Sequence, residues 1–229
     1  MPIIEKQWTT TVEQPVSIET GGVQLKGDLI VPEETFGLVL FAAGGEMSRS
    51  SSRSRRIARE FEEQGLAVLL VDLLTADEEE EDLHSGRLRA DIPLLSSRLL
   101  GVAEWAGRQA ELRDLPVGIF GQGPTAAASL IAAAERPRAL GAIVCRSGRV
   151  DLAGSALGNV QVPVLLLVGG ADGKMAEVNE SALLRLNESR RRELILIPGA
   201  PSRFEDPGEI EAVADLSADW FSQSLIELC

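Results

Sequence analysis

The stretch Val117–Leu130, V-G-I-F-G-Q-G-P-T-A-A-A-S-L, decides how this chain is expected to fold. It begins with an apolar, β-rich run that ends at Gly121, and it continues into an alanine-rich helical pattern. Small residues at the junction allow the backbones of a strand and a helix to come close together. The stretch therefore predicts a buried strand, a sharp turn, and a helix that packs against the same sheet.

Strands and helices are expected to alternate on both sides of this stretch. Gly21-Gly22 separates two apolar runs, Val16–Glu19 and Val23–Val31, which is typical of a β-hairpin. Further strands are expected at Gly37–Ala43, Leu66–Asp72, Leu115–Gly121, Gly141–Cys145, Val164–Gly169 and Glu193–Ile197. Helices are expected at Ser52–Gln64, Ile92–Arg108, Pro124–Glu135, Ala176–Ser189 and Glu209–Leu228. The acidic run Ala76–Asp82 is interpreted as a solvated loop.

This order predicts one α/β domain over residues 1–229. A hairpin followed by repeated strand–helix units gives a mostly parallel sheet of about eight strands with helices on both faces. Ligands of such sheets bind outside the carboxyl ends of the strands. The residues that follow each parallel strand are therefore the candidates for chemistry.

The composition limits the classes of function. The 229 residues carry a net charge of −13, and nucleic acids and anionic membranes are bound through basic residues. We therefore expect no nucleic-acid partner and no membrane. No apolar run reaches the roughly 18 residues of a membrane helix, and the first residues do not resemble a signal peptide. The two cysteines, Cys145 and Cys229, suggest no disulfide framework, so a cytoplasmic location is expected.

The turn within Val117–Leu130 has the layout of a nucleophile elbow, whose motif is G-x-S-x-G. Here the motif reads Gly121-Gln122-Gly123-Pro124-Thr125. The position of the nucleophile is therefore Gly123, which has no side chain. The final glycine of the motif has become Thr125.

The chain resembles the dienelactone hydrolases, a family with the α/β-hydrolase fold, over nearly its whole length. The segments that carry the resemblance follow one another with the family's order and spacing: Leu25–Leu29, Val71–Thr75, Leu88–Ile92, Ala132–Pro137, Gly148–Ala153, Leu167–Gly170 and Phe204–Gly208. The resemblance implies an α/β-hydrolase fold and hydrolysis of esters or lactones by a catalytic triad.

The resemblance also implies where the triad belongs, in the order nucleophile, aspartate, histidine. The acid falls on Asp172, which is retained, and the histidine falls on Ser202. Relatives carry a His-Gly pair beside the oxyanion hole, and here that pair is Ala43-Gly44. The next residues, Gly45-Glu46-Met47, replace a stretch that is usually small and rich in serine and glycine.

These replacements predict the loss of the family's reaction. A serine is a weak nucleophile until a base takes its proton, and removing a triad member leaves at most about 10³–10⁴-fold acceleration. His84 is the only histidine of the chain. An ionised Glu46 would also oppose the negative charge that an oxyanion site stabilises. We expect an inactive hydrolase scaffold, with no cofactor and no metal, and with its oligomeric state left open.

A pocket for a small molecule is still expected at this site. Besides the three triad positions, its lining is expected to include Ala43, Gly44, Gly45, Glu46, Gln122, Pro124 and Ser147. The loss could be natural, as in a pseudoenzyme, or the result of engineering.

Other interpretations stay open at this point. Ser147 or the thiol of Cys145 could serve as a non-standard nucleophile in an ester or lactone hydrolase. Glu46 could act as a general base in a redesigned site if burial raised its pKa. Glu46 and Asp172 could hold a cation, although two ligands are few for that purpose.

Five arginines gather at the start of the first helix expected after the hairpin: Arg49, Arg53, Arg55, Arg56 and Arg59. A helix N-terminus favours anions, so this patch could hold a phosphate or a carboxylate. The competing interpretation is a solvated helix face, or ion pairs with Glu60, Glu62 and Glu63.

Overall fold

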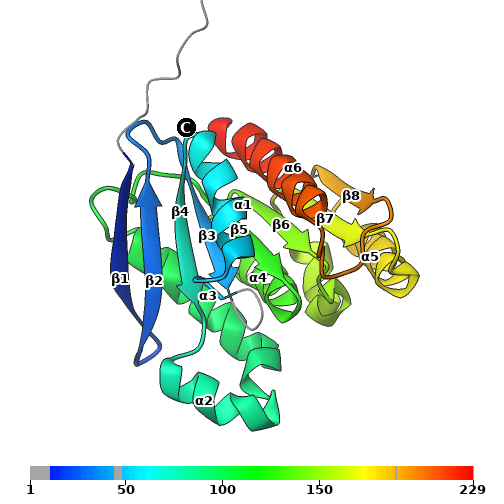
Figure 1. Cartoon of the computed structure of the whole chain (residues 1–229), viewed down its shortest axis with the longest axis horizontal. Coiled ribbons are helices and arrows are strands. Elements are labelled where there is room, and N and C mark those ends of the chain that lie inside the picture. Colours follow the sequence, from blue (N-terminus) through cyan, green and yellow to red (C-terminus); the bar gives the residue numbers. More distant parts are fainter. Residues whose placement is uncertain (1–10, 44–47, 189, 229) are drawn as a thin grey trace, which may run out of the picture.

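An eight-stranded sheet forms the centre of the computed structural model, which describes residues 11–43, 48–188 and 190–228 (Figure 1). Its strands are β1 (Val12–Thr20), β2 (Val23–Val31), β3 (Gly37–Ala43), β4 (Leu66–Asp72), β5 (Val117–Gln122), β6 (Ala142–Arg146), β7 (Val164–Gly169) and β8 (Arg192–Ile197). Their order is β1-β2-β4-β3-β5-β6-β7-β8. The pairs β1–β2 and β2–β4 are antiparallel, and all other neighbours are parallel. The predicted sheet, with its N-terminal hairpin, is confirmed.

Helices cover both faces of the sheet. They are α1 (Ser52–Glu63), α2 (Ala76–Ser85), α3 (Ile92–Ala106), α4 (Pro124–Glu135), α5 (Gly173–Arg185) and α6 (Pro207–Ile226), with 3-10 helices η1 (Leu88–Ala90) and η2 (Val150–Asn159). One face packs against α1 and α6, and the other packs against α3, α4, α5 and η2 (Figure 1). Among the described residues, no helix is long and apolar enough to cross a membrane.

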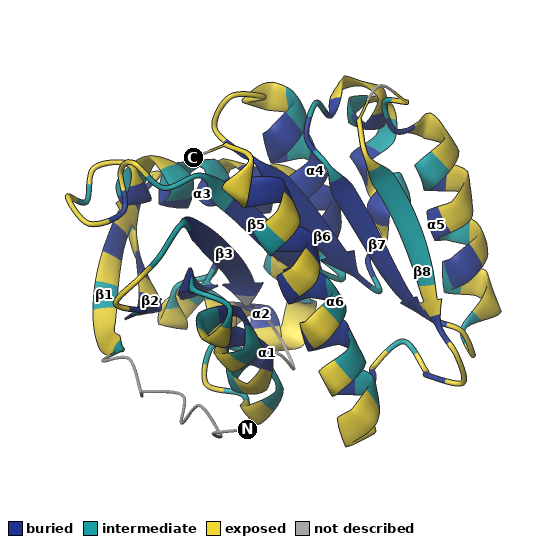
Figure 2. Cartoon of the chain, turned by 90° about the horizontal axis from the view of Figure 1, so that it is seen from above, coloured by how far each residue is buried: buried dark blue, intermediate teal, exposed yellow. Residues whose placement is uncertain are grey.

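The core consists of two apolar layers, one on each face of the sheet. Successive side chains of a strand point to opposite faces, so Ile143 and Cys145 of β6 enter the α3–α4 layer while Ala142 and Val144 enter the α1–α6 layer. The central strands are buried along their length, and the outer helices α1, α5 and α6 each have one buried and one exposed side (Figure 2). By this alternation, Arg146 at the end of β6 lies on the α1–α6 face.

The interpretation of the acidic run 76–82 as a solvated loop was wrong, because these residues form most of helix α2. Thr75 and Glu78 build a capping box, in which each side chain accepts a hydrogen bond from the other residue's backbone N–H, at 3.2 and 2.8 Å. Acidic residues in the first turn favour the positive end of the helix dipole. Gly86, with a φ of +62°, ends the helix in the left-handed region.

Asp82, also expected in a solvated loop, is fully buried. Its carboxylate accepts hydrogen bonds from the backbone N–H groups of Leu88 and Arg89, from Nε of Arg89 and from the hydroxyl of Ser85. Burial raises the pKa of Asp82, but these donors outweigh it and hold that pKa well below its ordinary value. The acidic helix is thus anchored by one internal carboxylate.

The remaining differences concern the ends of elements. Helix η2 was not predicted. Helix α5 was expected at 176–189, but it begins at Gly173 and ends at Arg185. It begins earlier because Asp172 caps it, with a side-chain oxygen accepting from the N–H of Met175.

Candidate functional site

The predicted site residues follow the carboxyl ends of neighbouring parallel strands. Gly123 follows β5, Ser147 follows β6, and Asp172 follows β7. Ser202 lies in the loop between β8 and α6. All of them therefore occupy the edge of the sheet at which ligands of α/β folds bind.

Gly123 keeps the sharp turn of the elbow. Its φ is +51° and its ψ is −123°, which is strained backbone for a residue with a side chain. A Cβ atom added to Gly123 would meet no heavy atom within 4 Å, so the space above it is open. At Gly121, by contrast, an added Cβ would lie 2.7 Å from Oγ of Ser129 and 2.8 Å from the carbonyl oxygen of Thr125. Only glycine fits there, because α4 packs closely against β5.

The side chain of Thr125 closes the turn. Its hydroxyl accepts a hydrogen bond from the N–H of Gln122 at 2.8 Å and donates one to the carbonyl oxygen of Gln122 at 2.9 Å. Pro124 is the first residue of α4 and has no N–H group. In a nucleophile elbow the residue at this place supplies one of the two backbone donors of the oxyanion hole. That donor is absent here.

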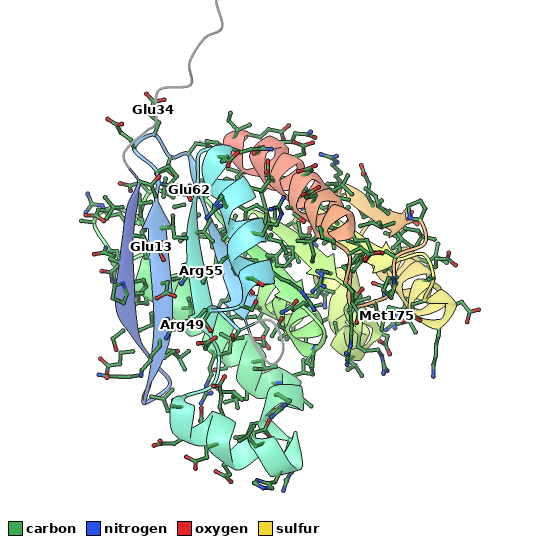
Figure 3. All side chains as sticks on the ribbon, in the orientation of Figure 1. Glu13, Glu34, Arg49, Arg55, Glu62 and Met175 are labelled. Carbon is green, nitrogen blue, oxygen red and sulfur yellow. The ribbon has the colours of Figure 1, made fainter. Side chains whose placement is uncertain are left out.

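Asp172 and Ser202 are brought together. The hydroxyl of Ser202 donates a hydrogen bond to Oδ2 of Asp172, and the N–H of Met175, in the first turn of α5 (Figure 3), donates to Oδ1 at 3.0 Å. The hydrogen bond from Ser202 is the main reason that the pKa of Asp172 is lowered, with the N–H of Met175 next and burial opposing both. Asp172 is therefore an ionised helix cap whose second oxygen is occupied by a serine.

Ser147 has an unusual backbone and a hidden hydroxyl. Its φ is +43°, and its N–H donates to the carbonyl oxygen of Leu167 at 2.8 Å. Its Oγ is buried, and no described residue provides a hydrogen-bond partner for it. Next to it, the carbonyl oxygen of Gly148 accepts a hydrogen bond from Nδ2 of Asn179 at 3.1 Å.

Arg146 was missed as a site residue by sequence reasoning. It is 4% exposed, although it directly precedes Ser147 at the edge where ligands bind. Its Nη1 donates to Oε1 of Gln122 at 2.7 Å and its Nη2 to the carbonyl oxygen of Arg203 at 2.6 Å. The guanidinium lies over the ring of Phe204, 4.8 Å from its centroid. The period-two alternation through Ala142 and Val144 was the available signal, because it carries Arg146 onto an interior face.

The arginine patch is largely neutralised, but not by the expected partners Glu60, Glu62 and Glu63. Arg49 pairs with Asp28 and with Asp72, each at 2.8 Å, between the hairpin strand β2 and the end of β4 (Figure 3).

The other paired arginines also reach across to different elements. Arg55 pairs with Asp28 and with Glu13, and Arg56 pairs with Glu211 of α6. These partners are far away in the sequence, so spacing along the first helix could not indicate them.

The remaining predicted residues divide into three groups. Gly44, Gly45 and Glu46 lie outside the described residues, and Ala43 ends β3 without a described side chain. His84 is exposed on α2. Cys145 is fully buried and burial raises the pKa of its thiol, which disfavours the reactive thiolate. Among the described residues, no three His, Cys, Asp or Glu side chains gather as metal ligands would.

A cavity of about 560 Å³ opens at the other edge of the sheet. It is lined by residues from the end of α3, from the segment before β5, and from the segment before β6, including Arg113, Arg136 and Arg138. None of the predicted site residues lines it, so it is separate from the elbow.

Solved structures resemble this chain over nearly its full length. A dienelactone hydrolase from Anabaena variabilis is 46% identical, with a TM-score of 0.90 over 94% of this chain and 99% of that one. Est1E from Butyrivibrio proteoclasticus shares the fold at 14% identity, with a TM-score of 0.74 over 92% of this chain and 98% of that one. No family model matches the sequence.

Curated sequences add longer relatives. Two Mycobacterium tuberculosis proteins, each named "putative phosphoribosyl transferase", are 43% identical over 216 residues, which is 93% of this chain. The chain spans 47% of the length of these relatives.

Proposed function

This chain belongs to the dienelactone hydrolase family, and from that premise we propose that it is a non-catalytic hydrolase-fold protein that binds a small molecule at the elbow without hydrolysing it. The family's reaction requires a nucleophile, a base that takes its proton, and donors for the oxyanion.

The hydrogen bond between Ser202 and Asp172 carries the proposal. In a triad, the aspartate orients a histidine, and the histidine takes the proton of the nucleophile. Here Asp172 holds a serine hydroxyl, which is far too weak an acid and base for that role at neutral pH. Gly123, at the tip of the elbow, offers no atom for the base to activate.

Loss of the oxyanion donor supports the same conclusion. Removing a single oxyanion-hole donor typically slows an enzyme by about 10²–10³-fold. Pro124 removes such a donor from the backbone. The site would therefore be slow even if a nucleophile reached it from elsewhere.

Ser147 is a poor alternative nucleophile. Its hydroxyl is buried, and no described residue accepts its proton. A hydrolase with a non-standard nucleophile would need a base at hydrogen-bond distance from this oxygen. The second alternative, Glu46 as a general base, concerns a residue outside the described part of the chain.

The name of the curated relatives does not transfer directly, because this chain matches only about half of their length. We infer that the matched half contributes the hydrolase-like domain, and that the transferase activity in their name belongs to the remaining half. An assay of this chain alone for phosphoribosyl transfer is then expected to give no product.

Turnover of activated esters and lactones by the purified chain tests the proposed function. We expect no hydrolysis above the rate in buffer at neutral pH. The matched variant is Ser147→Ala, which removes the alternative nucleophile and leaves the elbow as it is. Turnover that disappears in Ser147→Ala would contradict the proposal and assign the reaction to Ser147.

A further inference from the structure

We propose that Arg146 and Arg53 form a binding site for an oxyanion, the phosphate or carboxylate group of a small molecule, beside the elbow. This inference rests on the proposed ligand-binding function and names the chemistry of the ligand. Its starting point is a buried cation for which the described residues supply no counter-charge.

Arg146 is a buried guanidinium that no carboxylate in the described part of the chain pairs with. Its two hydrogen bonds go to neutral acceptors, the amide oxygen of Gln122 and the backbone carbonyl of Arg203. Its Nε is buried, and no residue within 11–43, 48–188 or 190–228 accepts a hydrogen bond from it. Burying a charge is costly unless it is paired, so an arginine at 4% exposure that no described carboxylate neutralises favours an anion as its ligand.

Arg53, in the first turn of α1, adds a second positive charge on the face of the sheet to which Arg146 also belongs. Burial is the main cause that lowers the pKa of Arg146 to about 10, and the charge of Arg53 lowers it further in the same direction. Two like charges in proximity disfavour each other's charged form. An oxyanion between or beside them would remove this repulsion.

Arg53 also stands apart from its neighbours. Arg49, Arg55 and Arg56 are all paired with carboxylates. No hydrogen bond or ion pair connects Arg53 with a described residue, and its side chain is half-buried in the first turn of α1. The first turn of a helix adds favourable potential for an anion, because its backbone N–H groups point outward.

The residues that hydrogen-bond to Arg146 lie next to the elbow and to Ser202. Gln122, which accepts from Nη1, directly precedes Gly123, and Arg203, which accepts from Nη2, directly follows Ser202. Phe204, whose backbone φ is +50°, holds its ring against the guanidinium. The orientation of the Arg146 guanidinium is therefore fixed by residues adjacent to Gly123 and Ser202, the two positions where the triad is lost.

The guanidinium of Arg146 is better suited to bind an oxyanion than a neutral or cationic group. A guanidinium is planar and presents its N–H donors in a fixed geometry that matches carboxylate and phosphate. Nη1 and Nη2 each use one hydrogen internally, so each has a second N–H that bonds no described residue and could donate to a ligand.

Calorimetric titration with inorganic phosphate and with acetate, each compared with chloride at the same ionic strength, tests this site. We expect wild-type protein to bind phosphate or acetate with a saturable heat. Arg53→Gln is expected to weaken that binding by roughly tenfold, as loss of one charge-assisted contact does. Arg146→Met is expected to abolish it, and circular dichroism establishes that each variant is folded.

Arg59→Gln is the matched control, because Arg59 lies exposed on the same helix and its loss changes the net charge equally. Its affinity is expected to equal that of wild type. Binding of phosphate alone supports the site and assigns a phosphate ligand, whereas binding of acetate alone supports it and assigns a carboxylate. Absence of both, or equal weakening by Arg59→Gln, would overturn the inference.

These outcomes are separate from those of the ester assay. Ester turnover together with Arg53-dependent phosphate binding would overturn the non-catalytic proposal and leave the oxyanion site standing. An inactive protein that binds neither anion would overturn the oxyanion site alone.

Discussion

The hydroxyl of Ser202 donates a hydrogen bond to Oδ2 of Asp172, on the carboxylate that would orient a histidine in an active member of the family. The same carboxylate caps α5 through the N–H of Met175. Asp172 thus has a structural role that does not require catalysis. Under the proposed non-catalytic function, this role explains why the acid remains useful to the fold.

Ser202→Ala is expected to raise the pKa of Asp172, because the first cause of its depression is removed. A carboxylate with a depressed pKa contributes stability above its unfolded pKa, near 3.9, and that contribution is lost as the pH falls through its folded pKa. The variant should therefore be less stable than wild type at neutral pH, with the difference vanishing in acid. Carboxyl-carbon NMR titration of Asp172, with urea unfolding at several pH values, measures both. An unchanged titration would contradict the hydrogen bond.

Restoring three side chains is expected to restore some esterase activity. The open space above Gly123 accommodates a serine, at a cost of about 1–3 kcal/mol for its positive φ. The variant Gly123→Ser, Ser202→His, Ala43→His then carries the nucleophile, the base and the loop histidine. Hydrolysis of an activated ester should rise above that of wild type. A folded variant that shows no gain even when Pro124→Ala is added would show that these are not the triad positions.

Pro124 should limit that rescue. Adding Pro124→Ala to the triple variant returns a backbone N–H at the first position of α4, where helix N–H groups have no internal partner. We expect kcat to rise by roughly 10²-fold, the usual worth of one oxyanion donor. Pro124→Ala alone, without the nucleophile, should stay inactive. Equal kcat with and without the N–H would show that residue 124 is not an oxyanion-hole donor.

Gly148→Ala is expected to destabilise the fold by about 1–3 kcal/mol, as overpacking of a core does. Its Cβ would lie 2.1 Å from Cβ of Ala126 in the elbow helix α4. Gly208→Ala is the matched control, because an added Cβ there meets nothing within 4 Å. Urea unfolding measures both, and Ala126→Gly should rescue Gly148→Ala. Similar midpoints for the two alanine variants would refute the close approach of this loop to α4.

Asp82→Asn is expected to loosen α2 and the segment that follows it. The neutral amide cannot neutralise Arg89, and the carboxylate otherwise accepts four hydrogen bonds from Ser85, Leu88 and Arg89. Because the folded pKa of Asp82 is depressed, the loss should be largest near neutral pH and should shrink in acid. Limited proteolysis and thermal unfolding report it, with Glu81→Gln on the exposed side of α2 as the control. Cleavage within α2 at the same rate in both variants would be the contrary result.

Most of the fold could be predicted from local pattern. The strands Gly37–Ala43, Leu66–Asp72 and Val164–Gly169 match to the residue, because each is an unbroken apolar run buried on both faces. The helix Pro124–Glu135 also matches, since proline begins it and alanines sustain it. The prediction of a loop at 76–82 was wrong because the acidic composition suggested solvent exposure, whereas the capping box of Thr75 and Glu78 begins a helix.

The site was harder to predict where contacts are distant in sequence. Arg49 forms ion pairs with Asp28 and Asp72 rather than with neighbouring glutamates. Arg146 donates a hydrogen bond to the backbone carbonyl of Arg203. No local pattern encodes these pairings, which are set by the order of the strands. The motif itself indicates the position of Gly123. The missing donor at Pro124 is recognised only when the role of each backbone N–H in the elbow is considered as well.

Intact-protein mass spectrometry after incubation with a fluorophosphonate detects an activated serine, because this reagent reacts preferentially with serines whose proton a base accepts. The central claim is that this hydrolase scaffold contains no activated nucleophile. We predict that the mass of the wild-type chain is unchanged, while the variant Gly123→Ser, Ser202→His, Ala43→His, Pro124→Ala gains one phosphonyl group at residue 123. A stoichiometric adduct on the wild-type chain, at Ser147 or at any other serine, would contradict the account.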